Sequence, residues 1–258
     1  MGSSIHQTAI VHPNAQIGEN VEIGPYAVIG ENVVVGEGTR IFPHVVIEGW
    51  TTIGKECQIF PGASLGSAPQ DLKFKDEKSY VFIGDGTTIR ECATVNRPVG
   101  EGEVTRVGSG VLMMAYTHVA HNCTVGDQVI MANAATLAGH VIVGNKAVIG
   151  GLAGIHQFVH IGDLVMIGGL TKITQDIPPY LLVDGNPAQI HGINRVGLMR
   201  NGFSEESRKQ IKRIYKLLYR SGLNTSQAIE ALKEMEPTPD TEKYLEFFAQ
   251  KSGRGITR

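Results

Sequence analysis

The chain has 258 residues and a net charge of −2, with 42% hydrophobic and 19% charged residues. This composition is typical of a folded globular protein, and the small net charge gives no field that would favour nucleic acid or an anionic membrane. No uninterrupted apolar run approaches the ~18 residues of a membrane-spanning segment, and the N-terminus lacks the basic and apolar regions of a signal peptide.

An aliphatic residue recurs at every sixth position from Ile5 onward. The rule holds without exception from Ile5 to Leu65, and the following residue is often glycine. The repeat resumes at Ile83, and again at Val107, from where it runs to Ile173. An amphipathic helix needs apolar residues three and four apart, and a half-buried strand needs strict alternation. Hexads of this kind instead predict short strands joined by turns and stacked as the coils of a β-helix.

Two segments interrupt the repeat and are predicted to leave the β-helix as loops. Residues 67–80 are polar and charged, and residues 97–105 are rich in glycine and proline. Long loops in a compact domain often carry function. We therefore expect one β-helical domain over residues 1–176 with two candidate functional loops.

The remainder of the chain has the pattern of helices. Residues 177–203 are predicted to connect the β-helix to a helical domain over residues 204–258. Helices can cover the apolar end of a solenoid. The expected helices and their capping residues are 205–220 with Ser204, 226–235 with Thr225, and 239–251.

The densest group of chemically active side chains is formed by His118, His121 and His140. If three hexads make one coil, as in hexapeptide-repeat proteins, residue i lies over residue i+18, and adjacent coils are about 4.8 Å apart. His121 then lies under Gly139, which lies under Gln157. A histidine beside a bare backbone N–H suits a general base next to an oxyanion donor. Three histidines can also bind zinc, or pack at contacts between subunits.

Several strings extend the comparison to a known family. The chain resembles the UDP-N-acetylglucosamine O-acyltransferases, the first enzymes of lipid A biosynthesis, over nearly its whole length. These strings are far more specific than the hexad repeat, which many transferases share. They are HVAHNCTVG (118–126), LAGHV (137–141), IHQF (155–158), PQDLKF (69–74), DIPPY (176–180), GNPA (185–188), RNGF (200–203) and YRSG (219–222).

The resemblance implies a mainly β fold, a left-handed parallel β-helix of hexapeptide repeats with a C-terminal α-helical domain. It implies a homotrimer with active sites between subunits and no metal or other cofactor. The donor would be a 3-hydroxyacyl chain on acyl carrier protein. The acceptor would be the 3-position of UDP-N-acetylglucosamine, a UDP-sugar.

The resemblance also assigns roles to residues of this chain. It implies that His121 is the catalytic base and that the Gly139 N–H stabilises the oxyanion. The implied substrate contacts are Gln70, Asp71, Lys73, His118, His140, His156 and Gln157, with Asn194 and Arg200 on the nucleotide or carrier side and Gly169 at the floor of the acyl groove.

Four positions depart from the family pattern. Asn96 stands where histidine is common, Asn122 where aspartate is usual, Val196 in place of glutamate, and Asn201 in place of arginine. An amide at position 122 can orient the ring of His121 but cannot stabilise an imidazolium as a carboxylate does. These departures leave a 3-amino sugar nucleotide open as an alternative acceptor.

A glycine column on another edge of the β-helix indicates room for the acyl chain. Gly150-Gly151 and Gly168-Gly169 are 18 residues apart. A groove without side chains can admit a hydrocarbon, and its burial gains about 0.8 kcal/mol per CH₂. We therefore expect a groove for a relatively long acyl chain.

Three other functions share the hexad repeat. They are an acyltransferase that uses acetyl- or succinyl-CoA, a γ-type carbonic anhydrase with a three-histidine zinc site, and a non-catalytic solenoid. The helical C-terminal domain and the 67–80 loop argue against the first. The cysteines, Cys57, Cys92 and Cys123, form no C-x-x-C pair and indicate free thiols in the cytoplasm.

Overall fold

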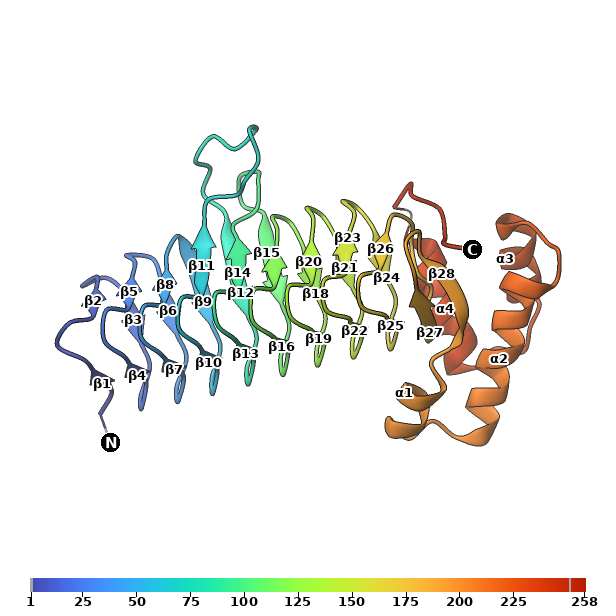
Figure 1. The fold of residues 1–258 in the computed structure, drawn as a ribbon, viewed down its shortest axis with the longest axis horizontal. Coiled ribbons are helices and arrows are strands. Elements are labelled where there is room, and N and C mark those ends of the chain that lie inside the picture. Colours follow the sequence, from blue (N-terminus) through green and yellow to red (C-terminus); the bar gives the residue numbers. More distant parts are fainter. Residues whose placement is uncertain (1, 251) are drawn as a thin grey trace.

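The computed structural model describes residues 2–250 and 252–258 and shows a long three-sided prism followed by a helical domain (Figure 1). Residue 1, where the predicted β-helix begins, and residue 251, where the third predicted helix ends, lie outside the described residues. Each coil adds one strand to each of three sheets, so that strands three apart in the chain are parallel neighbours through most of the prism.

The strands follow the hexads, and most are only two residues long. The first sheet, of 11 strands, contains β1 (Ser4–Ile5), β4 (Glu22–Ile23), β7 (Arg40–Ile41), β10 (Gln58–Ile59), β13 (Thr88–Ile89), β16 (Leu112–Met113), β19 (Ile130–Met131), β22 (Val148–Ile149), β25 (Met166–Ile167), β27 (Leu181–Asp184) and β28 (Gln189–Ile193). The second, of 9 strands, contains β2 (Ile10–Val11), β5 (Val28–Ile29), β8 (Val46–Ile47), β11 (Ser64–Ser67), β14 (Thr94–Asn96), β17 (His118–Val119), β20 (Thr136–Leu137), β23 (Gly154–Ile155) and β26 (Lys172–Ile173). The third, of 8 strands, contains β3 (Gln16–Ile17), β6 (Val34–Val35), β9 (Trp50–Ile53), β12 (Tyr80–Ile83), β15 (Val104–Val107), β18 (Thr124–Val125), β21 (Ile142–Val143) and β24 (His160–Ile161).

The six-residue repeat is the core of the prism. The aliphatic residue that ends each short strand points inward, as Ile59 and Leu137 do, and both are 0% exposed. The residue two positions earlier also points inward and is small or β-branched, as at Cys57, Ala135 and Val141. Burial of each aliphatic side chain stabilises the fold by about 1.5–3 kcal/mol. One large and one small inward residue per hexad therefore fill the prism coil after coil.

The corners of the prism place side chains in columns. Asn122, His140 and Phe158 follow each other at 18-residue spacing and all adopt the left-handed backbone conformation, with φ of 59°, 60° and 68°. This conformation costs a non-glycine residue about 1–2 kcal/mol, and a tight turn at each corner requires it. The three side chains consequently project from one corner, next to the predicted catalytic histidine.

Two loops leave the prism side by side (Figure 1). Residues 68–79 connect β11 to β12, and residues 97–103 connect β14 to β15. The Gly102 N–H donates to the Lys78 carbonyl oxygen at 2.9 Å, so the two loops are joined at their bases. Their closeness follows from the register, because β12 and β15 are neighbours in the third sheet.

The segment expected as a connection is structured. After the proline pair, β27 pairs parallel with β25, and β28 then pairs antiparallel with β27. A short helix, α1 (Arg195–Arg200), follows. The first sheet therefore continues beyond the last hexad, and the helical domain begins from its end.

Three longer helices complete the chain: α2 (Glu205–Arg220), α3 (Thr225–Lys233) and α4 (Pro239–Ala249). The predicted helix near 205–220 is confirmed, and the Ser204 side chain caps it by accepting from the Ser207 N–H. The prediction that Thr225 caps the second helix is wrong. Asn224 is the cap, because its side chain and that of Gln227 form a reciprocal capping box that satisfies two backbone N–H groups.

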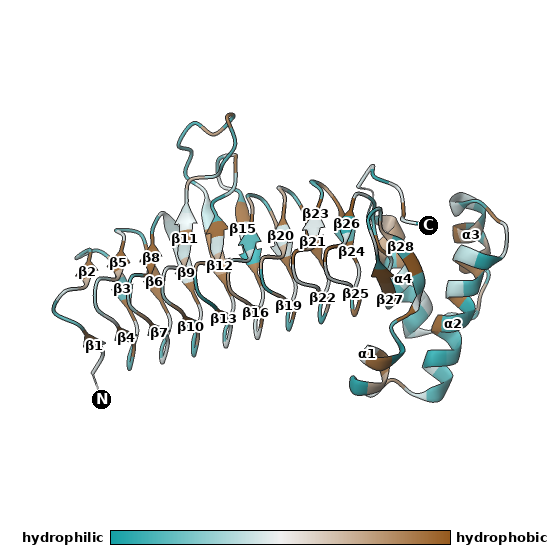
Figure 2. Cartoon of the chain, in the orientation of Figure 1, coloured by the Kyte–Doolittle hydropathy of each residue, from teal (hydrophilic) through white to brown (hydrophobic). Residues whose placement is uncertain are grey.

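The helices bury a second apolar cluster at the C-terminal end of the prism. Figure 2 shows the hydrophobic strand residues running the length of the prism and α2 carrying hydrophilic residues on its outer side. The buried members of the cluster are Leu164, Tyr180, Leu198, Ile211, Ile214, Leu218, Ala228, Leu232 and Tyr244. Because Leu164 and Tyr180 come from the prism, the helical domain covers its last coils. No helix among the described residues is long and apolar enough to cross a membrane.

Candidate active site

The imidazole of His121 lies against the backbone of Gly139, one coil further along the prism. A Cβ atom on Gly139 would overlap Cε1 and Nε2 of the His121 ring. Within residues 2–250 and 252–258, the Gly139 N–H donates to no protein acceptor. His121 is 8% exposed. The glycine thus gives the ring its place and presents an unused donor beside its reactive edge.

Asn122 holds the other nitrogen of the ring. Its Oδ1 lies 2.9 Å from His121 Nδ1 and also accepts the Val99 N–H at 3.0 Å. Its Nδ2 donates to the Val99 carbonyl oxygen at 3.1 Å. The Asn122 N–H donates to Thr105 Oγ1 at 2.9 Å. The side chain that the sequence marked as a departure therefore ties the 97–103 loop to the histidine.

The 68–79 loop places a carboxylate over the histidine. Asp71 Oδ2 lies 3.6 Å from His121 Nε2, and the exposed fractions of the two side chains are 24% and 11%. Asp71 Oδ1 accepts the Lys73 N–H at 2.8 Å, which fixes the turn of the loop. Gln70 and Lys73 are exposed on the same loop. Of the predicted loop residues, the chain therefore brings Asp71 directly to His121.

The two other histidines of the cluster surround His121. His118 Nδ1 lies 2.6 Å from Thr94 Oγ1, and the His140 ring meets the His121 ring edge to face, with centroids 5.2 Å apart. Burial lowers the pKa of His118, and the nearby His121 lowers it further. The same two causes lower the pKa of His140. Both rings are therefore mainly neutral near pH 7 and can donate to or accept from a polar substrate.

The next coil extends the patch through residues that sequence reasoning partly missed. Phe158 stacks on His140 with centroids 4.6 Å apart, and the Arg254 guanidinium lies over Phe158 at 5.9 Å. Arg254 Nε donates to the Gln157 carbonyl oxygen at 3.0 Å, and His156 Nδ1 lies 3.2 Å from that oxygen. The 18-residue spacing from His140 could have identified Phe158, which the sequence analysis did not name, whereas nothing in the aperiodic C-terminal tail points to Arg254.

The two residues of each glycine pair have different surroundings. A Cβ atom on Gly150 would overlap the backbone of Gly168, and one on Gly168 would overlap Asp184, so close packing of coils requires both. A Cβ atom on Gly169 would lie 3.3 Å from the Gly151 carbonyl oxygen, and the backbone of Gly169 is not in the left-handed conformation. Gly151 and Gly169 thus form a column that coil packing alone does not demand.

The predicted nucleotide-side residues lie away from the cluster in one chain. Asn194 caps α1, with Oδ1 accepting the Gly197 N–H at 2.9 Å and Nδ2 donating to the Leu164 carbonyl oxygen at 2.8 Å. Arg200 ends α1 and is exposed. Figure 1 places α1 beyond the last coil, several coils from the two loops. A single chain therefore does not bring Asn194 and Arg200 to His121.

The remaining departures from the family pattern have local explanations, with one exception. Asn96 is 6% exposed, and its Nδ2 donates to the Ala68 carbonyl oxygen at 3.3 Å at the base of the 68–79 loop. Asn201 Nδ2 donates to the Gly197 carbonyl oxygen at 2.9 Å and helps to end α1. Val196 is 57% exposed, and no contact explains it.

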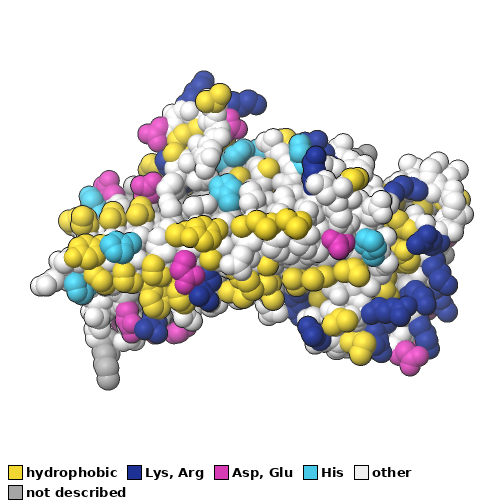
Figure 3. Space-filling model, in the orientation of Figure 1, with side chains coloured by type: hydrophobic (Ala, Val, Ile, Leu, Met, Phe, Trp, Pro, Cys, Tyr) yellow, Lys and Arg dark blue, Asp and Glu magenta, His cyan; other side chains and the backbone are white. Residues whose placement is uncertain are grey.

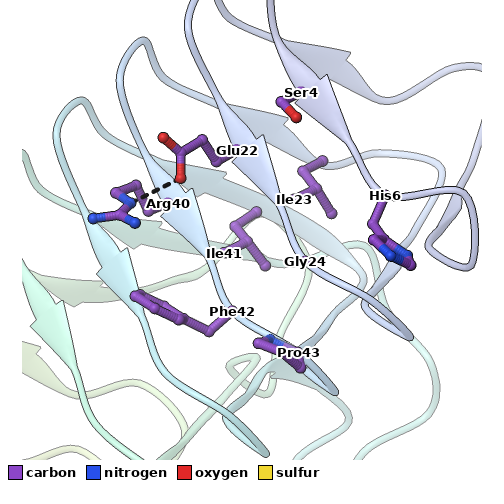
Figure 4. Close-up of a pocket in the computed structure, with 9 residues that line it drawn as sticks. All are labelled: Ser4, His6, Glu22, Ile23, Gly24, Arg40, Ile41, Phe42 and Pro43. Atoms are coloured by element: carbon purple, nitrogen blue, oxygen red, sulfur yellow. Dashed lines mark hydrogen bonds and ion pairs between the residues drawn. The ribbon is translucent and has the colours of Figure 1, made fainter.

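Neither the hollow on the first coils nor a metal site is a better candidate for the active site than this cluster. A hollow of about 330 Å³ lies on the first coils (Figure 4), but its charged side chains, Arg40 and Glu22, bond to each other at 2.9 Å. In the part of the chain that the structure describes, no three His, Cys, Asp or Glu side chains are placed to bind one metal ion. The histidine cluster is therefore the best candidate for the active site.

Family models match both parts of the chain. The model described as "Udp N-acetylglucosamine O-acyltransferase; Domain 2" matches residues 176–257, and the model of the GMPPB C-terminal domain matches residues 5–62. The acyl-[acyl-carrier-protein]--UDP-N-acetylglucosamine O-acyltransferase of Thermodesulfovibrio yellowstonii is 47% identical over 99% of this chain and 100% of its own. The enzyme of the same name from Chlamydia caviae is 46% identical over 99% of this chain and 92% of its own.

Solved structures give the same result. The UDP-N-acetylglucosamine acyltransferase of Francisella novicida has a TM-score of 0.96 and 40% identity, covering 98% of this chain and 94% of its own. The structure of LpxA from Acinetobacter baumannii has a TM-score of 0.94 and 41% identity, covering 98% and 99%. Together with the three mostly parallel sheets and the C-terminal helices, this likeness confirms the expected left-handed parallel β-helix with a helical domain.

Proposed function

This chain belongs to the UDP-N-acetylglucosamine O-acyltransferase family, and we propose that it transfers a 3-hydroxyacyl chain from acyl carrier protein to the 3-position of UDP-N-acetylglucosamine, the first step of lipid A biosynthesis. The observation that carries this proposal is the arrangement of His121, with its Nε2 edge beside the Gly139 N–H and the Asp71 carboxylate. One base, one oxyanion donor and one acceptor-binding group then meet at a single point.

The hydrogen bonds of Asn122 decide which nitrogen of His121 is basic. Only the amide NH₂ group can donate to the Val99 carbonyl oxygen, so the amide oxygen must face the Val99 N–H and His121 Nδ1. An oxygen without a proton accepts, and Nδ1 must therefore carry the hydrogen. The lone pair of the neutral ring is then on Nε2, on the side of Gly139 and Asp71.

The reaction follows from this tautomer. Nε2 of His121 takes the proton of the sugar 3-hydroxyl while its oxygen attacks the thioester carbonyl carbon. The carbonyl oxygen becomes an oxyanion, which the Gly139 N–H stabilises. When the intermediate collapses, the carbon–sulfur bond breaks, and the leaving thiolate takes the proton from His121. The ester and the free thiol of the carrier are the products, and His121 returns to its neutral form.

Asp71 supplies the negative charge that Asn122 lacks. Once His121 has taken the proton, a carboxylate 3.6 Å from Nε2 stabilises the imidazolium. Both side chains are mostly buried, so solvent screens this attraction less than it would at the surface. We propose that Asp71 also accepts from a hydroxyl of the sugar, which places the acceptor between the two side chains.

The glycine column supports a groove for the acyl chain. Gly151 and Gly169 carry no side chain, whereas the residues that follow them, Leu152 and Leu170, are 62% and 70% exposed. On the second sheet, between the glycine column and His121, the paired strand residues Thr136 and Gly154 are small. We propose that the hydrocarbon lies along this floor, where each buried CH₂ contributes about 0.8 kcal/mol.

A second subunit is needed to complete this site. One prism face offers no second wall, and the exposed leucines beside the glycine column would be covered by a neighbour. Asn194 and Arg200, which lie far from His121 in one chain, would reach it from another subunit. We propose a cytoplasmic homotrimer with cyclic symmetry and active sites between subunits.

The carrier protein has a candidate docking surface on the helical domain. Figure 3 shows Lys and Arg side chains gathered at this end of the molecule. On α2 they are Arg208, Lys209, Lys212, Arg213, Lys216 and Arg220. Such a patch attracts an acidic partner and speeds its association at low salt. We propose that acyl carrier protein binds here.

The test is a product analysis with a panel of donors and acceptors. Purified protein is mixed with 3-hydroxyacyl carrier proteins, acetyl-CoA or succinyl-CoA, and with UDP-N-acetylglucosamine or its 3-amino analogue. Mass spectrometry should find an acylated sugar nucleotide only with the carrier-bound donors. Transfer from CoA thioesters alone would overturn the proposal.

A further inference from the structure

Arg97 is a buried arginine at the start of the 97–103 loop. It is 8% exposed, and its guanidinium lies over two aromatic rings, 5.5 Å from the centroid of Trp50 and 5.3 Å from that of Phe74. Trp50 begins strand β9 of the prism, whereas Phe74 belongs to the 68–79 loop. One side chain thus connects the loop that carries Asp71 to the rigid body of the prism.

Other contacts of Arg97 serve the same connection. Its Nη2 lies 3.3 Å from Asp76 Oδ1, and its backbone N–H donates to the Ser67 carbonyl oxygen at 2.9 Å. A Cβ atom on Gly49 would overlap the Arg97 side chain, and Gly49 has a φ of 62°, so a glycine there leaves the space that the arginine fills. The loop is consequently held at both its beginning and its middle.

The same turn reaches the catalytic histidine. Two residues after Arg97, the backbone of Val99 makes the paired hydrogen bonds with Asn122, whose Oδ1 orients His121. Ser79 Oγ, at the end of the 68–79 loop, donates to the Pro98 carbonyl oxygen at 2.9 Å. Residues 97–99 therefore contact both the 68–79 loop and Asn122, the residue that sets the tautomer of His121.

Stability alone does not account for this arginine. Arg97 Nε is buried without a hydrogen-bond partner among the described residues, and the side chain of its ionic partner Asp76 is 87% exposed. A buried charge with so little compensation is a poor stabiliser, and an apolar residue of similar volume usually does as well or better. A flat cation over two rings does, however, fix the position of Phe74 and of the loop around it.

We propose that Arg97 is a positioning residue that holds the 68–79 loop so that Asp71 lies over His121. This inference rests on the proposed function, because it gives the loop the task of binding the acceptor sugar. It implies that kcat/KM for the acceptor depends on Arg97, whereas the KM for the acyl carrier protein does not.

The test compares three variants with a matched control. Arg97→Met keeps the length and apolar packing of the side chain, and Arg97→Lys keeps its charge but not its plane. Phe74→Leu removes the aromatic ring of the loop that Arg97 contacts, and it replaces the Arg97 variants in the test if they do not fold. The control is Arg106→Met, because Arg106 lies 4.6 Å over the ring of Phe82 on the same sheet, and its side chain makes no ion pair with either loop within the described residues.

Hydrogen exchange and kinetics are measured on each variant. In Arg97→Met, residues 68–79 should exchange faster, and kcat/KM for the acceptor should fall roughly 10–100-fold, since a misplacement of about 1 Å costs up to 10². The KM for the acyl carrier protein should stay within twofold. Arg97→Lys should resemble Arg97→Met, and Arg106→Met should resemble the wild type.

Two results would overturn the inference. One is unchanged exchange of residues 68–79 in a folded Arg97→Met or Phe74→Leu variant. The other is a KM for the acyl carrier protein that worsens by the same factor as kcat/KM for the acceptor, which would indicate general destabilisation. A wild-type protein that acylates no sugar nucleotide would refute the proposed function instead, and the exchange of the loop would still decide whether Arg97 holds it.

Discussion

The ring of His121 lies so close to Gly139 that any side chain at position 139 would displace it. This contact joins the two residues to which the sequence assigned the chemistry, the base and the oxyanion donor. Under the proposed mechanism, a thioester carbonyl that binds the Gly139 N–H lies next to the hydroxyl that His121 activates. The first prediction follows from this arrangement.

Replacing His121 should abolish base catalysis without unfolding the protein. In His121→Ala, kcat should fall roughly 10²–10⁴-fold, the usual effect of losing a general base. The exposed His12 on the first coils provides a control, and His12→Ala should keep wild-type turnover. Near-normal turnover in a His121→Ala protein with unchanged circular dichroism would refute the assignment.

Asn122 should influence the choice between a hydroxyl and an amine acceptor. An amide at Nδ1 orients His121 but adds no negative charge on that side, so a base supported by Asp71 alone is weaker than one with a second carboxylate behind Nδ1. An amine is the better nucleophile and needs less from the base. We expect the 3-amino sugar nucleotide to be used at least as well as the 3-hydroxy one. In Asn122→Asp the preference should move toward the hydroxyl, although the bond to the Val99 carbonyl oxygen is lost.

Side-by-side kcat/KM values for the two acceptors check this prediction. The ratio within each protein is the relevant quantity, because it cancels differences in folding or in the concentration of active sites. A large wild-type preference for the hydroxyl acceptor would contradict it.

A side chain at Gly169 should shorten the accepted acyl chain. The backbone there is not left-handed, and a Cβ atom would meet the Gly151 carbonyl oxygen at 3.3 Å, so a small local shift accommodates it. Gly169→Ala should have a small effect, and Gly169→Met should favour shorter chains while His121 chemistry is retained. Competition between carrier proteins of different acyl length measures the shift, with Thr124→Met on another face as the control. An unchanged length profile in Gly169→Met would refute the groove.

Acid should weaken the fold through two half-buried histidines, His118 and His140. The pKa values of His118 and His140 are below the ordinary value of 6.5 in the folded state, so the unfolded chain binds their protons more tightly. The free energy of unfolding should therefore be highest above pH 6.5 and should decrease as the pH falls from there toward the folded-state pKa values. Denaturant titrations from pH 8 to pH 5 measure this slope.

The His118→Gln variant isolates one of these contributions. It removes a titrating group while keeping a polar side chain near Thr94, so its stability should depend less on pH than that of the wild type. Equal slopes for wild type and His118→Gln would show that burial of this ring does not control acid stability.

Complementation should reveal sites shared between subunits. If Arg200 serves the His121 of a neighbour, mixed trimers of His121→Ala and Arg200→Ala chains contain some sites with both residues intact. Coexpression should therefore restore activity that neither variant has alone, and sedimentation should show three chains per particle. A fully active monomer, or no recovery in the mixture, would contradict the shared site.

The hexad repeat determined most of the fold and the centre of the site before any tertiary structure was known. Each hexad carries its own signal, an inward aliphatic residue and a turn, so residues such as Ile59 and Leu137 predict their burial locally. The constant period then converts sequence distance into spatial order. For this reason the stacking of His121 under Gly139 followed from counting, once the resemblance to hexapeptide-repeat proteins supplied three hexads per coil.

Only the tertiary structure decided what surrounds that centre. The loops and the C-terminal tail have no period, and contacts between distant residues place them, such as Arg97 with Phe74 and Arg254 with Phe158. The role of Asn122 likewise depends on Val99, which the register of two loops brings to it. A repeat encodes the geometry within itself, whereas the positions of segments that leave it depend on packing energies that no local pattern expresses.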